Sequence, residues 1–233
     1  MRIAAGQIES RLGDFDYHLE QHLHLMSLAA EQGANLIIYP ELSLTGYLDK
    51  GAIEMAKEFA PLIMQFTQVL QQASNQFQIA IGGGFPKLDG KQVFINHRFI
   101  FPDCACWDYQ KRLLHDDELP YYTPGQKDNL LQWQNKHLAI GICYESLQQP
   151  HVNRHKNADA YLVGVAKSNH SMASAFEFYG ETARKLNMPI IFSNATGKSA
   201  DYINAGQSAV WTNSGALKAV LNKTETGLVC IDI

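Results

Sequence analysis

The first apolar and polar positions of the chain predict a strand, a helix and a second strand. Arg2–Ile8 is nearly continuous in apolar residues, as is typical of a buried strand. Asp14 and Asp16 are candidate N-caps for a helix that ends at Gly33. Its apolar residues recur at spacings of four, three and four: Leu19, Leu23, Met26 and Ala30. Leu36–Pro40 is a second short apolar strand, which completes a βαβ pattern.

The rest of the chain consists of short apolar segments and two longer helical stripes. One stripe follows Pro61 and the other ends near Leu186, and a short helix is expected around Val152–Lys156. Arg112–Lys127 is rich in proline and charge and is expected to be a loop. The further expected strands are Ile79–Ile81, Val93–Phe101, Cys104–Lys111, His137–Cys143, Ala160–Val165, Ile190–Ser193, Gln207–Thr212, Ala216–Leu221 and Leu228–Ile233. Many strands with few long helices favour a layered α/β sandwich, and residues 1–233 are expected to form a single domain.

Composition narrows the choice of function by what it excludes. The formal net charge of −4 offers no basic face for nucleic acid. No segment approaches the roughly 20 apolar residues that a membrane helix requires. Four scattered cysteines do not suggest a disulfide framework. We therefore expect a soluble cytoplasmic protein with no nucleic acid or membrane partner.

Three chemically active residues stand where apolar strands meet loops. Glu41 follows the second strand, Lys111 ends the strand from Cys104, and Cys143 ends the strand from His137. Side chains at strand ends are held rigidly and often form active sites, so the three could converge on one mouth. Taken singly, each has an ordinary alternative: a capping carboxylate, a solvated surface cation and an inert core cysteine.

The three windows together resemble motifs of the nitrilase superfamily, the carbon–nitrogen hydrolases. The glutamate window reads Tyr-Pro-Glu-Leu-Ser-Leu-Thr-Gly-Tyr at positions 39–47, the lysine window Tyr-Gln-Lys-Arg-Leu at 109–113, and the cysteine window Gly-Ile-Cys-Tyr-Glu at 141–145. The resemblance extends along the chain, through Ala183–Pro189 and the Gly206-Gln207-Ser208 segment. It implies a four-layer α-β-β-α sandwich, and a homodimer formed through outer helices.

The resemblance also implies roles for the site residues. Glu41 would be the general base, Cys143 the nucleophile that forms a thioester, and Lys111 with the backbone N–H of Tyr144 the stabiliser of the oxyanion. A second family glutamate is best matched by Glu118, with Glu145 or no role as alternatives. No metal or cofactor is required. Cys104 and Cys106 are attributed to strand packing rather than to metal binding.

The residues after the nucleophile bear on the substrate. Tyr144 stands where nitrile-cleaving members usually carry Trp, which favours an amidase-type reaction. The arginine that often follows in branches acting on carboxylate-bearing amides is absent, so the sequence offers no carboxylate clamp there. Glu145 with the acidic loop residues hints at a cationic substrate, although surface solvation explains those charges as well. Acyl transfer to an amine, and a catalytically silent module of the same fold, are the alternatives.

Overall fold

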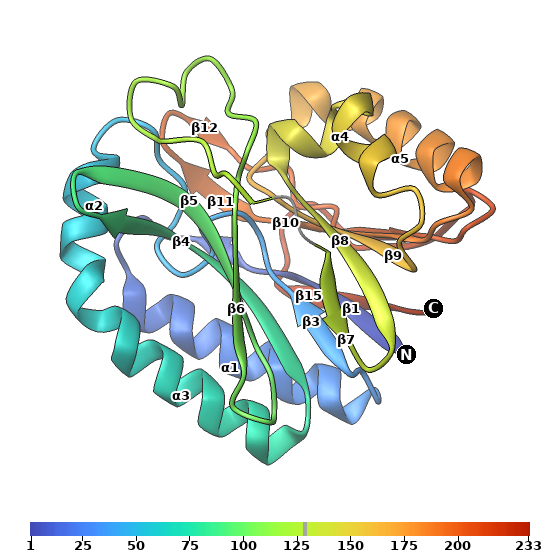
Figure 1. Cartoon of the computed structure of the whole chain (residues 1–233), viewed down its shortest axis with the longest axis horizontal. Coiled ribbons are helices and arrows are strands. Elements are labelled where there is room, and N and C mark those ends of the chain that lie inside the picture. The colour runs from blue at the N-terminus through green and yellow to red at the C-terminus, as the bar shows by residue number, and fades with distance from the viewer. Residues whose placement is uncertain (128–129) are drawn as a thin grey trace.

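The computed structural model describes residues 1–127 and 130–233, and its strands form two six-stranded sheets (Figure 1). Both sheets mix parallel and antiparallel neighbours. The first runs in the order β15 (Gly227–Asp232), β1 (Arg2–Gln7), β3 (Leu36–Ile38), β4 (Ala80–Asp89), β5 (Gln92–Ile100) and β6 (Cys106–Gln110). The second runs β14 (Leu217–Val220), β13 (Ala209–Trp211), β10 (Ile190–Asn194), β9 (Ala160–Val165), β8 (Lys136–Ile142) and β7 (Leu131–Trp133).

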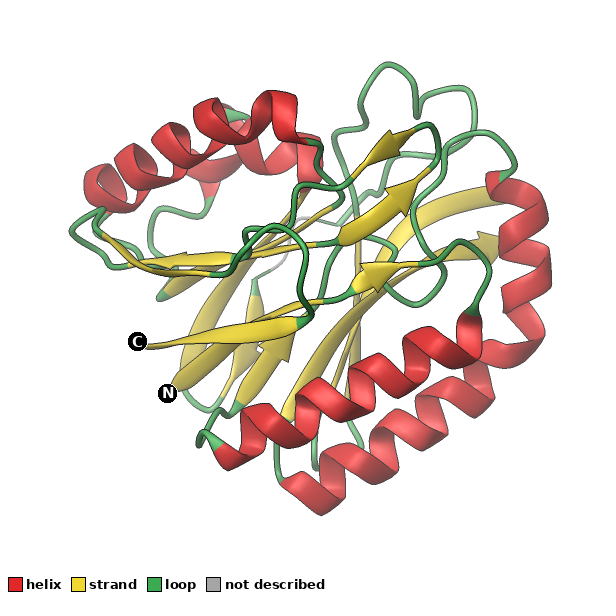
Figure 2. Cartoon of the chain, turned by 180° about the vertical axis from the view of Figure 1, so that it is seen from behind, coloured by secondary structure: helices red, strands yellow, loops and turns green. Residues whose placement is uncertain are grey.

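Helices cover the outer face of each sheet, which makes four layers (Figure 2). The helices are α1 (Phe15–Glu31), α2 (Ala52–Phe59), α3 (Ile63–Phe77), α4 (Gln149–Arg154) and α5 (Met172–Leu186). Three hydrophobic clusters fill the spaces between the layers. One joins inner-face residues of the two sheets, such as Ile38 and Ile140. The others pack α1 and α3 on the first sheet and α4 and α5 on the second. The expected four-layer α-β-β-α sandwich is confirmed.

A small third sheet links the two large ones. β2 (Glu9–Ser10) leaves β1 and pairs in parallel with β11 (Thr196–Ser199), which follows β10 and also pairs with β12 (Tyr202–Ile203). It ties the two inner layers together beyond the ends of β1 and β10.

The element boundaries differ from expectation in a few places. The strand expected at Ile79–Ile81 continues through three glycines to Asp89. The glycines do not end the strand: Gly84 packs against the backbone of Leu42, where a side chain would not fit. α2, β7 and the small sheet are absent from the sequence-based prediction. The helix expected at Val152–Lys156 instead spans Gln149–Arg154, with Pro150 in its first turn.

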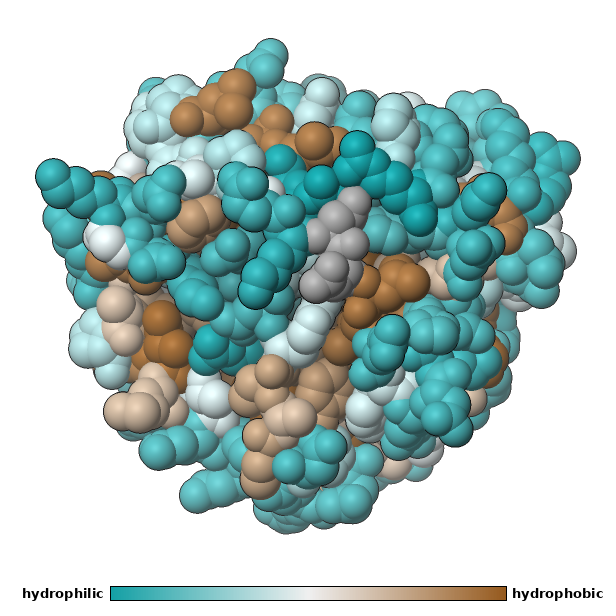
Figure 3. Space-filling view, viewed as in Figure 1, coloured by the Kyte–Doolittle hydropathy of each residue, from teal (hydrophilic) through white to brown (hydrophobic). Residues whose placement is uncertain are grey.

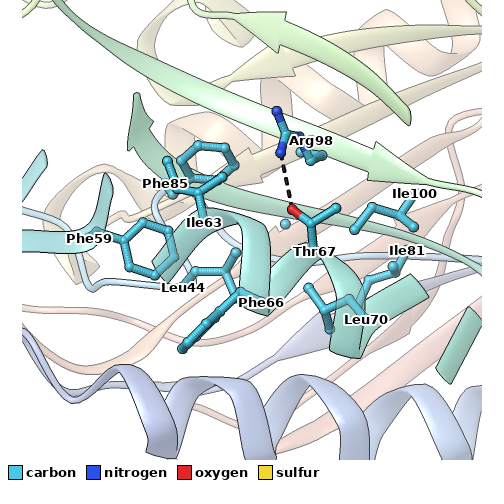
Figure 4. Close-up of a pocket in the computed structure, with 11 residues that line it drawn as sticks. Leu44, Phe59, Ile63, Phe66, Thr67, Leu70, Ile81, Phe85, Arg98 and Ile100 are labelled. Atoms are coloured by element: carbon cyan, nitrogen blue, oxygen red, sulfur yellow. Dashed lines mark hydrogen bonds between the residues drawn. The ribbon is translucent and has the colours of Figure 1, made fainter. Parts of the chain in front are cut away.

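An apolar pocket lies between α3 and the first sheet, away from the strand-end residues (Figure 4). Arg98 is a polar residue at its rim, where a guanidinium nitrogen donates to Thr67 Oγ1 at 3.1 Å. The same guanidinium pairs with Asp108, so its charge is already compensated. The outer face seen in Figure 3 is mainly hydrophilic, with separate apolar patches.

Candidate active site

Glu41 sits on a tightly held turn after β3. Leu44 N donates to Gly84 O at 2.9 Å, and Gly84 N donates to Ser43 Oγ at 3.1 Å. Ser43 Oγ also bonds His22 Nε2 at 3.0 Å. Leu42 adopts a positive φ of 48°, which reverses the chain directly after Glu41. The carboxylate is therefore fixed from both the sheet and α1.

Lys111 follows β6 and bridges two carboxylates in the interior. Its Nζ donates to Glu41 Oε1 at 2.8 Å and to Glu118 Oε1 at 2.6 Å. The side chains of Lys111 and Glu41 have no exposed surface, and that of Glu118 is 2% exposed. The simple alternative for Lys111, a solvated surface cation, is wrong, and the Glu41 carboxylate accepts from Lys111.

Glu118 is held by three donors from three different segments. Besides Lys111, Oε1 accepts from the Tyr47 hydroxyl at 3.0 Å, and Oε2 accepts from His115 N at 2.8 Å. The 112–127 segment that carries Glu118 is a loop, as expected, and the Tyr122 hydroxyl anchors it to Leu48 O at 2.7 Å. The loop thus delivers a second carboxylate to the lysine.

Cys143 stands at the junction of β8 and a 3-10 turn, Cys143–Leu147. It has a positive φ of 46°, which is strained for a residue with a side chain and is common at functional sites. The residue as a whole is half-buried. Nucleophiles need this combination of fixed geometry and access.

The two sheets approach each other closely at this point. Gly164 of β9 lies against the backbone of the other sheet, where an added Cβ would be 2.8 Å from Tyr39 O and 3.5 Å from Glu41 N. β9 is the parallel neighbour of β8, with Ile142 paired to Gly164. The end of β8, and Cys143 with it, is thereby brought to Glu41.

Burial has the largest effect on the pKa values of the trio formed by Glu41, Lys111 and Cys143. It raises the pKa of Glu41 to about 7, although Lys111 and the nearby Cys143 thiol act to lower it. Burial and then the Glu41 charge raise the pKa of the Cys143 thiol to about 12. Burial alone would lower the pKa of Lys111, but the Glu41 and Glu118 charges outweigh it and leave the pKa raised. Lys111 is therefore a permanent cation, and Glu41 is tuned for proton transfer near neutral pH.

Glu41 keeps one oxygen free for chemistry. Oε2 is buried and has no hydrogen-bond partner among the described residues. A buried acceptor without a donor is costly, so its persistence beside a thiol is a functional signal.

Glu145 plays a different part from the ones that the sequence suggested. It is fully buried, so the surface explanation for its charge is wrong. Oε2 accepts from the backbone N–H of Arg112 at 2.8 Å and of Leu113 at 3.1 Å, and Oε1 accepts from Ile142 N at 3.0 Å. The carboxylate thus ties the chain just after Lys111 to the residue just before Cys143. Both oxygens are occupied by backbone donors, which leaves a cationic substrate little to bind there.

Tyr144 lies at the surface, next to Cys143 in the chain. The residue is 37% exposed, and its ring meets the His115 ring edge-on, with the ring centroids 5.2 Å apart. Its backbone N–H lies in the first turn of the 3-10 segment, where such groups have no acceptor within the turn. Asp116 and Asp117 are exposed, as the surface explanation for them requires.

Three further residues near the trio were missed from the sequence. Tyr47, at the end of the glutamate window, holds Glu118. The Tyr202 ring lies 6.3 Å from that of Tyr47, and its hydroxyl donates to Ala166 O at 2.7 Å. Lys167 follows β9. The position of Lys167 just after a buried strand could have indicated it as a candidate site residue. No local sequence pattern indicates Tyr202.

Other kinds of site receive no support within residues 1–127 and 130–233. No group of three or more His, Cys, Asp or Glu side chains there could hold a metal ion. Cys104 and Cys106 are free and exposed. No helix in these ranges is long and apolar enough to cross a bilayer.

A family model of carbon–nitrogen hydrolases matches residues 2–233. The chain belongs to the carbon–nitrogen hydrolase family. Among relatives, it is 26% identical over 154 residues to an (R)-stereoselective amidase of Pseudomonas sp., which covers 66% of this chain and 55% of the relative. It is 21% identical to a glutamine-dependent NAD(+) synthetase of Thermotoga maritima, over 100% of this chain and 42% of the synthetase. The chain thus spans about half the length of the curated relatives it matches.

Solved structures show the same fold for this carbon–nitrogen hydrolase. The NitN amidase of Nesterenkonia sp. AN1 has a TM-score of 0.90 at 23% identity, over 100% of this chain and 92% of that chain. A cysteine mutant of the Nesterenkonia AN1 amidase, described as a member of the nitrilase superfamily, also has a TM-score of 0.90, at 23% identity over 100% and 90% of the two chains. The resemblance to the nitrilase superfamily seen in the sequence is confirmed.

Proposed function

We propose that this chain hydrolyses amide-type carbon–nitrogen bonds of small molecules through a thioester on Cys143. The observation that carries the proposal is the Lys111 ammonium held between two buried carboxylates, beside a thiol on a strained turn. A cysteine hydrolase needs a base, an oxyanion stabiliser and a nucleophile in contact, whereas a catalytically silent module of the same fold needs none of the three. Two similar proteins support the class: one is an (R)-stereoselective amidase, and a mutant of the Nesterenkonia amidase carries the acetamide moiety of fluoroacetamide on its active-site cysteine.

Acylation begins with the thiol protonated. Because the pKa of the Cys143 thiol lies well above that of Glu41, the thiol keeps its proton at rest, and the proton moves to Glu41 Oε2 only as the sulfur forms its bond to the amide carbon. The oxyanion receives an N–H of Lys111 and the backbone N–H of Tyr144. Two of the three ammonium protons already bond Glu41 and Glu118, which leaves one for the substrate.

Breakdown returns the proton. Protonated Glu41 gives it to the departing nitrogen, the carbon–nitrogen bond breaks, and ammonia or an amine leaves the thioester. Glu41 then takes a proton from water, whose oxygen attacks the thioester carbon. The sulfur leaves, is reprotonated by Glu41, and a carboxylic acid is released. Glu118 holds Lys111 in place throughout.

The test compares Cys143→Ala with Cys230→Ala. A panel of small amides is scored for ammonia release, and the intact protein is weighed to find an acyl adduct on Cys143. We expect turnover and adduct to vanish in Cys143→Ala, with an unchanged circular dichroism spectrum, and to persist in Cys230→Ala. Full activity of Cys143→Ala would end the proposal. Adding amine acceptors separates hydrolysis from acyl transfer.

We also propose that residues 1–233 form one catalytic domain that acts in the cytoplasm as a homodimer. The family model that spans residues 2–233 supports one domain. Pairing through outer helices is implied by the family resemblance. Sedimentation velocity tests it, since a single species of about 26 kDa would contradict the dimer.

A further inference from the structure

Lys167 emerges beside the nucleophile. β8 and β9 are parallel neighbours, with Ile142 paired to Gly164, so the residues that follow the two strands leave the sheet at the same edge. Cys143 directly follows β8, and Lys167 lies two residues beyond Val165, the last residue of β9. The chain thus places a second lysine next to the thiol, from the strand adjacent to the one that carries it.

The backbone of Lys167 is fixed by the next strand. Its N–H donates to Asn194 Oδ1 at 2.9 Å, at the end of β10. Its carbonyl accepts from Asn194 Nδ2 at 3.1 Å and from Ala205 N at 2.8 Å. Three bonds to the backbone of one residue are more than a loop cation on the surface needs, and they preorganise the side chain.

The ammonium of Lys167 has no anionic partner in the described part of the chain. Nζ donates to the neutral Ser171 Oγ at 3.1 Å, and no described carboxylate lies within 4.0 Å. Lys87, Lys136 and Lys185 each pair with a carboxylate. The Lys167 side chain is nonetheless half-buried. A partly desolvated cation without a counterion is an unfilled electrostatic site.

The charge of Lys167 reaches the reacting sulfur. Burial and Glu41 raise the pKa of Cys143, while Lys111 and Lys167 are the cations that act against them. The Tyr202 hydroxyl, bonded to Ala166 O, fixes the peptide just before Lys167. Asp116 and Asp117 of the acidic loop are exposed, and Asp117 is engaged by His115 Nδ1 at 2.6 Å. The acidic loop therefore does not neutralise Lys167.

We propose that Lys167 binds a carboxylate of the substrate, so that the enzyme prefers amides that carry a carboxylate on a short chain. This rests on the proposed amide hydrolysis and names its substrate class. The arginine that is missing after Cys143 would have served this purpose, and Lys167 supplies the cation from the next strand instead. A lysine ammonium is a compact point charge with three donors, so it can bond Ser171 and a carboxylate together.

The experiment uses pairs of amides that differ only in charge: glutaramate against pentanamide, and succinamate against butanamide. For the wild-type protein, kcat/KM should favour the charged member of a pair. Lys167→Met should lower kcat/KM for the charged amide on the order of 10- to 100-fold, mostly through KM, as for loss of a charge-assisted hydrogen bond. Neutral amides should change less than about threefold, and Lys167→Arg should retain most of the preference.

Lys223→Met is the matched control, because Lys223 is exposed and bonds Asn169 on the same segment at 3.2 Å. It should leave both members of each pair unchanged. Equal losses on charged and neutral amides in Lys167→Met would overturn the inference and assign Lys167 to the thiol. Wild-type turnover without preference for charge would overturn it too. If no amide is cleaved and Cys143 is never acylated, the proposed function itself fails.

Discussion

Replacing Glu41 by Gln should change how the free energy of unfolding depends on pH. Burial raises the pKa of Glu41 to about 7, against an ordinary value of 4.5. The folded protein therefore binds this proton more tightly than the unfolded chain does. The stability that follows is complete below pH 4.5 and is lost as the pH rises to about 7. Between pH 5 and pH 8 the loss is about 2.5 kcal/mol.

Gln has the same shape, keeps an oxygen for Lys111 and cannot ionise. The difference in unfolding free energy should thus move in favour of Glu41→Gln by about 2.5 kcal/mol from pH 5 to pH 8. Urea titrations at several pH values, followed by the fluorescence of the three tryptophans, measure it. Glu177→Gln, on the exposed face of α5, controls for the loss of one carboxylate. A difference that stays constant with pH would mean that Glu41 is ionised throughout, and the case for it as a base that titrates near neutrality would fail.

Four further outcomes follow from the site. The value of kcat/KM should rise with pH through about 7, because Glu41 must be ionised to act; a flat profile from pH 5.5 to 8.5 would contradict this. Lys111→Gln should lower kcat about 100- to 1,000-fold, and steady-state kinetics that show only a raised KM would assign Lys111 to ground-state binding. Glu145→Gln should cost about 1–3 kcal/mol in urea unfolding, because its amide nitrogen must face a backbone donor; an unchanged midpoint would show that the three N–H groups find other partners. Gly164→Ala should cost about 1–3 kcal/mol and lower kcat, since its Cβ would press on Tyr39 O, and loss of stability without loss of kcat would separate packing from the position of Glu41.

The pattern of apolar and polar positions along the chain predicted most of the architecture. The expected strand Ala160–Val165 matches β9 residue for residue, and the strand before Cys143 ends one residue earlier than expected. A continuous apolar run of this length is typical of a strand that is buried on both faces, and such a run can be seen directly in the sequence. The expected helix before Gly33 also forms, but His18 and His22 occupy the N-terminal part of its buried face. Hydrogen bonds to their rings make that burial tolerable, and these depend on tertiary partners.

The residues of the candidate site divide in the same way, into those that the sequence predicted and those whose position depends on tertiary contacts. Glu41, Lys111 and Glu118 could be proposed from the sequence, because each lies in or near a family motif, and the structure brings them into one hydrogen-bonded cluster. The role of Glu145 was predicted wrongly, because the residue type alone does not show that backbone N–H groups from two separate segments bind its carboxylate. Lys167 and Tyr202 reach the site through neighbouring strands and the small sheet, and that proximity has no counterpart in local spacing.

The two carboxylates that share Lys111 are chemically alike, and their donors tell them apart. Glu118 accepts from Lys111, the Tyr47 hydroxyl and His115 N, so donors engage both of its oxygens. Glu41 accepts from Lys111 through one oxygen, while its other oxygen is buried without a partner among the described residues. Adding a proton to Glu41 breaks no bond at that oxygen, whereas neither oxygen of Glu118 is free of a donor. Glu41 can thus take up and release a proton twice in each turnover while Glu118 holds Lys111 in place, and this asymmetry of donors assigns the base to Glu41.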